Sequence, residues 1–202
     1  MSLWLAEAPL VLASKSEVRC AVLQTAGIPV EVQPADIDER ALEARAQTTD
    51  AGEIAALLAR EKARAIARRL PGRLVLGADQ TLALGSQRFS KPADRAAARD
   101  QLKSLRGQTH TLHTAVALAR GESIVFEHRE IARLTMRTFS DGFLECYLDA
   151  AGAAVTASDG AYQLEKIGVQ LFARIEGDHF AILGLPLFAL LQYFRREGCL
   201  AG

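Results

Sequence analysis

The chain has 202 residues, half of them hydrophobic, so it can bury a substantial core in one folded unit or two closely joined lobes. Its 24 basic residues balance 24 acidic ones, which excludes a global field favouring nucleic acid or an anionic membrane surface. With three dispersed cysteines (Cys20, Cys146 and Cys199), no leader pattern and no long apolar run, we expect a reduced, cytoplasmic protein.

The chain begins with the pattern of a strand, a small polar turn and a helix. Residues 9–13 predict a buried strand, and residues 17–26 predict a helix with Ser16 as its N-cap. The amides and dipole of such a helix start can bind an anion, and Arg19 supports this, because a first-turn cation is otherwise disfavoured. The alternative is that Ser14 and Ser16 are ordinary capping residues and that Arg19 is solvated.

A second strand is predicted over residues 28–33, followed by the carboxylates Asp36, Asp38 and Glu39. In an extended segment Asp36 and Asp38 face one way and Glu39 the other, so at most two share a face. The cluster is either a solvated loop or part of a metal site.

The clearest helical pattern runs from about residue 51 to residue 70. Ile54, Leu58 and Ile66 follow one another on one face, and Lys62 completes their row. A lysine on the inward stripe either extends its ammonium to the surface or reaches toward a phosphate.

Residues 74–76 predict a short buried strand that ends at Gly77, which permits a close backbone approach. Asp79 would then lie at the strand tip, where ligands bind in α/β sheets. It could bind a metal or act as a base there, and the alternative is a capping or turn aspartate.

The middle of the chain predicts a hairpin over residues 81–89, turning at residues 85–86, and then a helix from Asp94 to about Leu105. Lys91 lies between this hairpin and this helix, and the proline that follows it favours an extended backbone. Residues 107–120 and 124–137 predict a pair of antiparallel strands. We expect structural or surface roles for the histidines, which are His110, His113, His128 and His179.

The last third predicts a helix over residues 140–149, a loop over 150–158, a strand over 169–175 and a C-terminal helix that starts around Pro186. The stretch 169–187 is apolar enough to make a homodimer conceivable.

Taken together, several segments resemble the Maf family in order and spacing, and they are LASKSEVR, PADIDER, LAREKA, GADQ, SKP, LRGQTH, GAYQLE and RIEGDHFAILGLPL. The resemblance implies a nucleoside triphosphate pyrophosphatase that cleaves NTP to NMP and pyrophosphate with a divalent metal, Mg²⁺ or Mn²⁺. It also implies an α/β fold like that of the inosine triphosphate pyrophosphatases. That fold has a mixed central sheet with flanking helices, and residues 1–202 would form one domain whose two lobes border an active-site cleft.

The resemblance also implies roles for individual residues. By position, Asp79, Lys62 and Lys91 match the family's catalytic aspartate and two lysines, and Glu39 with Asp79 would bind the metal. Ser14, Ser16 and Arg19 match its phosphate-binding motif.

The sequence departs from the usual family pattern at several of these motifs. Glu17 replaces a proline after the serines, and Arg19 alone remains of an arginine pair. Asp159 replaces an alanine before the GAYQLE segment. Gln80 and Glu165 occupy positions that are commonly Thr and Gln, as in members that resemble the pyrimidine-preferring branch of the family. The pairing of Gln80 with Glu165 instead resembles the branch acting on 7-methyl-GTP, where a carboxylate could face a cationic purine edge, so this preference is favoured over a pyrimidine-type one.

Two other classes of function compete with the enzyme. A nucleotide-sensing protein that regulates cell division without turnover stays open, because the phosphate-binding motif is altered. A serine or cysteine hydrolase is weak, since there is no GxSxG segment and no histidine is placed near a nucleophile.

Overall fold

The structure is a computed structural model, and it describes residues 3–202 as two units. The first unit comprises Met1–Gln80, Thr114–Glu130 and His179–Gly202, and the second comprises Thr81–His113 and Ile131–Asp178. Strands β3 (Val75–Leu84), β5 (Thr109–Arg120) and β6 (Ser123–Met136) contribute residues to both units.

The first unit is built on strands in the order β2-β1-β3-β5-β6. Strand β1 (Leu10–Leu12) lies parallel to both β2 (Val30–Val32) and β3. The helices of this unit are α1 (Glu17–Thr25), α2 (Glu39–Arg45), α3 (Ala51–Ala67), α6 (His179–Ile182) and α7 (Leu187–Arg196).

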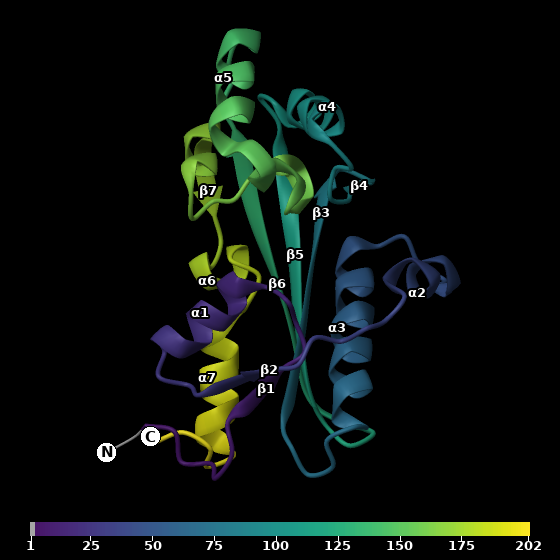
Figure 1. The fold of residues 1–202 in the computed structure, drawn as a ribbon, viewed down its shortest axis with the longest axis vertical. Helices are drawn as coiled ribbons and strands as arrows, with labels where there is room; N and C mark the ends of the chain where they lie inside the picture. The colour runs from purple at the N-terminus through teal and green to yellow at the C-terminus, as the bar shows by residue number, and fades with distance from the viewer. Residues whose placement is uncertain (1–2) are drawn as a thin grey trace. The chain divides into compact units, whose positions relative to one another are not determined.

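Helices cover both faces of these strands, with α3 and α7 on opposite sides (Figure 1). Because successive side chains of a strand point to opposite faces, Leu10 and Leu12 join a core with Phe194 of α7. Val11 instead packs in a separate core with Ala63 of α3. A strand covered on both faces is apolar throughout, which explains the uninterrupted run at residues 10–12.

Gly77 sets how closely α3 approaches β3. A Cβ atom at this position would lie 2.1 Å from the carbonyl oxygen of Ala59 and 2.6 Å from the amide nitrogen of Ala63. The predicted close backbone approach is therefore confirmed, and it brings the α3 turn that carries Lys62 against the strand that carries Asp79.

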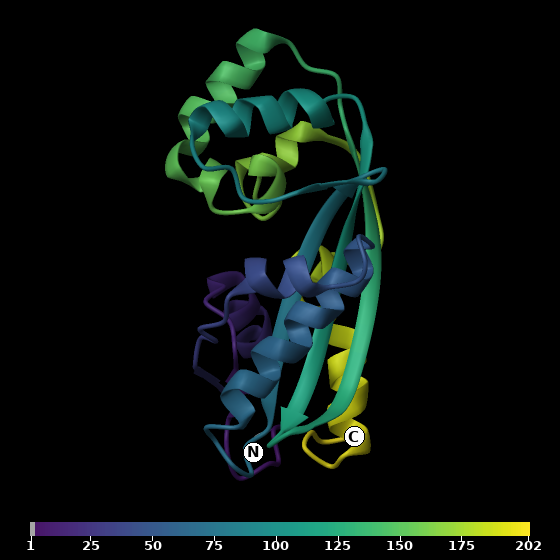
Figure 2. The ribbon, with the colours of Figure 1, turned by 90° about the vertical axis from the view of Figure 1, so that its right-hand side faces the viewer.

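The second unit contains β4 (Gln87–Phe89), antiparallel to β3, and β7 (Phe172–Glu176), antiparallel to β6. Leu84 pairs with Gln87, so residues 85–86 form the predicted two-residue turn. Helices α4 (teal) and α5 (green) lie on one side of the strands of this unit (Figure 2). The helical segments of this unit are α4 (Arg95–Leu105), α5 (Asp141–Ala151) and the 3₁₀ turns η1 (Gly152–Thr156), η2 (Asp159–Ala161) and η3 (Ile167–Leu171).

Parallel and antiparallel strand pairs flanked by helices confirm the predicted α/β class with a mixed sheet. The single domain with a cleft between two lobes stays a prediction. Among residues 3–202, no helix has both the length and the apolar composition needed to span a bilayer.

Two details of the N-terminal half differ from the predictions. Strand β3 does not end at Gly77 but continues to Leu84, so Asp79 lies within the strand and not at its tip. The polar segment after Gly77 continues the strand because the sheet supplies backbone partners there. Helix α2 was not predicted, since none of its seven residues is buried and no apolar period marks it.

Boundaries also shift elsewhere. Helix α3 ends at Ala67 and not at residue 70, and the predicted loop over 150–158 contains the end of α5 and the 3₁₀ turn η1. The strand expected from residue 169 begins at Phe172, because residues 167–171 form the 3₁₀ turn η3. Short 3₁₀ turns have no repeat long enough to be read from apolar spacing.

Candidate active site

The centre of the candidate site is a lysine between two carboxylates. Lys62 of α3 donates a 2.6 Å hydrogen bond from Nζ to Oδ1 of Asp79 and forms a 2.9 Å ion pair with Oε1 of Glu39. Asp79 is only 8% exposed, whereas the Glu39 side chain is about half exposed. The inward-facing lysine predicted from the α3 pattern thus meets the predicted catalytic aspartate directly.

Asp79 lies past the end of the neighbouring strand β1. Leu12, the last residue of β1, lies opposite Leu76, so β3 runs on past the carboxyl end of its parallel neighbour. Asp79 therefore lies beyond that strand end, where α/β sheets place their ligands, although it is inside β3 itself.

Burial makes the Asp79 carboxyl a weaker acid than an exposed aspartate. Removal from water raises the pKa of the Asp79 carboxyl above its ordinary value of 3.8, while the charges of Lys62 and Arg19 oppose this rise. The carboxylate of Glu39 raises the pKa further. A carboxylate whose pKa lies above its usual range is a stronger base than an exposed aspartate.

The predicted phosphate-binding turn is tightly organised. The Ser16 hydroxyl accepts a hydrogen bond from the Arg19 amide at 3.3 Å, as expected of an N-cap. The hydroxyl of Ser14 accepts from the Ser16 amide and from Nη1 of Arg19, both at 3.2 Å. Ser14, Ser16 and Arg19 are thus brought together, and their role toward a phosphate stays a prediction.

Arg19 also holds two backbone carbonyls. Its Nη1 donates to the carbonyl of Ala78 and its Nε to the carbonyl of Gly184, each at 2.8 Å. Gly184 has a φ of +88°, and a Cβ there would lie 2.9 Å from Nε of Arg19. Gly184 therefore belongs to the candidate site through its contact with Arg19, and no local pattern within the motif RIEGDHFAILGLPL marks it out.

The side-chain amide of Gln80 is bound by groups of β5 and α6. Its Nε2 donates to the hydroxyl of Thr114 at 2.7 Å and to the carbonyls of Ala181 and Ile182 at 3.0 and 3.2 Å. Thr114 donates in turn to the carbonyl of Ala181 at 2.9 Å. The amide nitrogen of Gln80 thus anchors α6, and contact with a nucleobase stays a prediction.

The remaining predicted residues lie in the second unit. Lys91 is exposed just after β4, and Glu165 is exposed between η2 and η3. Their roles as phosphate and base contacts stay predictions.

A divalent metal fits the carboxylates of this site. Mg²⁺ is commonly bound by one or two carboxylates, with substrate phosphates and water completing its oxygen ligands. Glu39 and Asp79 converge on a single cation, the ammonium of Lys62, so their carboxylates could supply two such ligands. Among residues 3–202, no three His, Cys, Asp or Glu side chains come together in a group that could hold a metal ion.

A sequence profile of Maf-like proteins matches residues 9–197. The chain belongs to the Maf family. It is 55% identical to a nucleoside triphosphate pyrophosphatase of Rhodopseudomonas palustris (strain BisB18), over 100% of both chains. It is 47% identical to a 7-methyl-GTP pyrophosphatase of Brucella abortus, over 96% of this chain and 98% of that protein.

Solved structures give a weaker similarity. A HAM1 protein from Coxiella burnetii matches with a TM-score of 0.44 and 19% identity, over 63% of this chain and 72% of that chain. Membership of the Maf family is shown by the profile match over residues 9–197 and by the relatives in sequence.

Proposed function

We propose that this Maf-family protein is a nucleoside triphosphate pyrophosphatase that releases NMP and pyrophosphate and prefers 7-methyl-GTP. The full-length identity to nucleoside triphosphate pyrophosphatases supports the activity. The observation that carries the chemistry is the buried Asp79 carboxylate held against Lys62.

In the proposed reaction, a water oxygen bonds to the α-phosphorus and the bond from that phosphorus to the bridging oxygen of the β-phosphate breaks. Asp79 orients the water and accepts its proton, a step its raised pKa favours. Pyrophosphate leaves with the electron pair of the broken bond. Lys62 and Lys91, with the turn from Ser14 to Arg19, bind the charged phosphates, and each charged contact is worth about 1.5–3 kcal/mol.

The metal we propose is Mg²⁺ or Mn²⁺, held by Glu39 and Asp79. When bound, it would neutralise phosphate charge. Lys62, which contacts both carboxylates, would give up part of this contact to the metal and turn its ammonium to the substrate.

The proposed base preference rests on Glu165 and on the Brucella relative. A carboxylate favours the positive charge that N7-methylation places on guanine, whereas a neutral amide does not. The 47% identity to a protein named for 7-methyl-GTP supports the same preference.

The test is pyrophosphate release from a panel containing 7-methyl-GTP, GTP, dTTP, UTP and CTP, with Mg²⁺, with Mn²⁺ and with a chelator. We expect turnover that is fastest with 7-methyl-GTP and absent with the chelator, and a loss of about 10²–10⁴-fold in Asp79→Asn. Glu165→Gln should reduce the preference for 7-methyl-GTP over GTP. Tight NTP binding without turnover on any nucleotide would instead support the nucleotide-sensing alternative.

A further inference from the structure

Gln101, in the middle of α4, uses its side-chain amide to form hydrogen bonds with two segments that are far apart in the sequence. Its Oε1 accepts a 3.1 Å hydrogen bond from the Gly160 amide, and its Nε2 donates a 2.7 Å hydrogen bond to the Ser90 carbonyl. Ser90 immediately precedes Lys91, and Gly160 begins the GAYQLE segment that leads to Glu165. One side chain thus links the residue before Lys91 to the start of the segment that leads to Glu165, the two predicted substrate contacts of the second unit.

The segment that Gln101 holds is strained and strongly constrained. Ala161 has a φ of +60° and is the one non-glycine residue with positive φ among residues 3–202. That conformation costs an alanine about 1 kcal/mol, so neighbouring contacts must maintain it. Tyr147 supplies one of them by donating a 3.0 Å hydrogen bond to the carbonyl of Ala161.

A second constraint joins the LRGQTH and GAYQLE motifs. His110 is fully buried, and its Nε2 shares a 2.8 Å hydrogen bond with the hydroxyl of Tyr162. Phe172 packs against both rings, with ring centroids 5.9 Å from His110 and 4.8 Å from Tyr162. The segment around Gly160 is therefore held by two sets of contacts. His110 of β5 and Phe172 of β7 contact Tyr162, and Gln101 of α4 binds the Gly160 amide.

We propose that Gln101 is a positioning residue that fixes the Lys91 turn and the Gly160–Glu165 segment in one arrangement for the nucleotide. This inference rests on the roles proposed above for Lys91 and Glu165. A substrate that contacts both would then meet a surface that is already ordered, and it would lose little conformational entropy there on binding.

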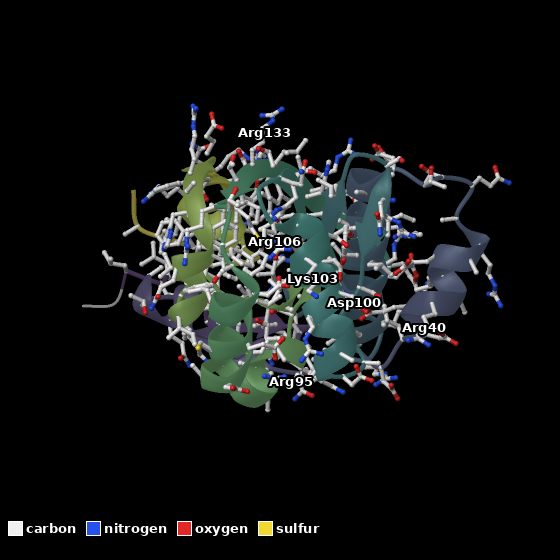
Figure 3. The ribbon with its side chains drawn as sticks, turned by 90° about the horizontal axis from the view of Figure 1, so that it is seen from above. Arg40, Arg95, Asp100, Lys103, Arg106 and Arg133 are labelled. Atoms are coloured by element: carbon white, nitrogen blue, oxygen red, sulfur yellow. The ribbon has the colours of Figure 1, made fainter. Side chains whose placement is uncertain are left out.

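Two substitutions distinguish the hydrogen bond to Gly160 from the hydrogen bond to Ser90. Gln101→Met keeps the length of the side chain and removes both hydrogen bonds. Gln101→Glu keeps an acceptor for the Gly160 amide and loses the donor to the Ser90 carbonyl. Asp100→Asn, on the neighbouring exposed residue of α4 labelled in Figure 3, is the matched control.

The measurements are steady-state kinetics on 7-methyl-GTP and GTP and backbone amide hydrogen exchange. In Gln101→Met we expect KM to rise about tenfold with little change in kcat, a lower preference for 7-methyl-GTP, and faster exchange at residues 160–165. In Gln101→Glu we expect a raised KM with the base preference and the protection of residues 160–165 retained.

Two results would overturn the positioning role. One is a Gln101→Met protein whose KM, base preference and exchange all match those of Asp100→Asn, and the other is a fall in kcat alone. If the unmodified protein turns over no nucleotide, the proposed function fails instead. The exchange at residues 160–165 then still decides whether Gln101 orders the segment.

Discussion

At the scale of single residues, the chemistry depends on how burial and charge compete at Asp79. Burial raises the pKa of this carboxyl, and Lys62 is the largest influence that opposes the rise. In the proposed mechanism, the 2.6 Å contact between them would therefore lower the pH at which Asp79 becomes available as a base.

Removal of the Lys62 charge should move the acid limb of activity. In Lys62→Met, the pKa of Asp79 rises further, so we expect the acid limb of kcat/KM to shift to higher pH. The maximal kcat/KM should also fall, by about 10- to 100-fold for the loss of one charged hydrogen bond. The measurement is the pH profile of kcat/KM for 7-methyl-GTP.

Lys103→Met, on exposed α4, serves as the control because its charge acts on the pKa of Asp141 and not on that of Asp79. An acid limb at the same pH in Lys62→Met and in the unmodified protein would show that Asp79 is not the base.

At the scale of elements, the site depends on the distance between α3 and β3. Lys62 and Asp79 come from different elements, and they meet because Gly77 lets the helix backbone touch the strand. Similarly, α6 is held by Gln80 and Thr114, and Arg19 holds the carbonyl of Gly184 just after that helix.

A methyl group at position 77 should separate these elements. Gly77→Ala places its Cβ within 2.6 Å of two α3 backbone atoms, so the helix must shift away from the strand. We expect a loss of about 2–4 kcal/mol in the free energy of unfolding and a large fall in kcat. Urea unfolding and nucleotide turnover measure the two effects.

Gly142→Ala is the matched control, since Gly142 lies in α5 and a Cβ there would lie 3.8 Å from the hydroxyl oxygen of Ser140, an ordinary van der Waals contact. Alanine should be neutral there or stabilise the helix by about 0.5–1 kcal/mol. Equal stability of the two variants would contradict the close approach of α3 to β3.

At the scale of the whole molecule, a buried histidine of the second unit makes the stability depend on pH. Burial lowers the pKa of His110 from 6.5 to about 4. Between these values the unfolded chain takes up a proton that the folded chain refuses, so this contribution to stability is complete above pH 6.5 and is lost toward pH 4. Asp79, whose folded pKa is raised, acts in the opposite sense.

The variant His110→Phe should therefore flatten the acid side of the stability curve. Complete loss of the His110 contribution corresponds to about 3 kcal/mol. We expect the free energy of unfolding to fall less between pH 6.5 and pH 4 in His110→Phe, as measured by urea unfolding at several pH values. Tyr162→Phe removes the hydrogen-bond partner and keeps the imidazole, so it should retain the full slope.

Features that depend on neighbours in the chain were predictable. Ser16 and Asp94 cap their helices by accepting from the amides three residues ahead, and the turn at residues 85–86 needs only its own glycine. The Maf motifs were likewise enough to identify the family and the residues expected in its site.

Other features depend on contacts that only folding creates. The hydrogen bond from Gln80 to Ala181 spans 101 residues, and the one from Arg19 to Gly184 spans 165. No local pattern records such partners, because they are set by which elements pack together. The sequence by itself therefore determined the family and the residues proposed for the site. The tertiary structure decided that Asp79 lies within a strand against Lys62, that Gln80 anchors α6 and that Gln101 links two distant segments.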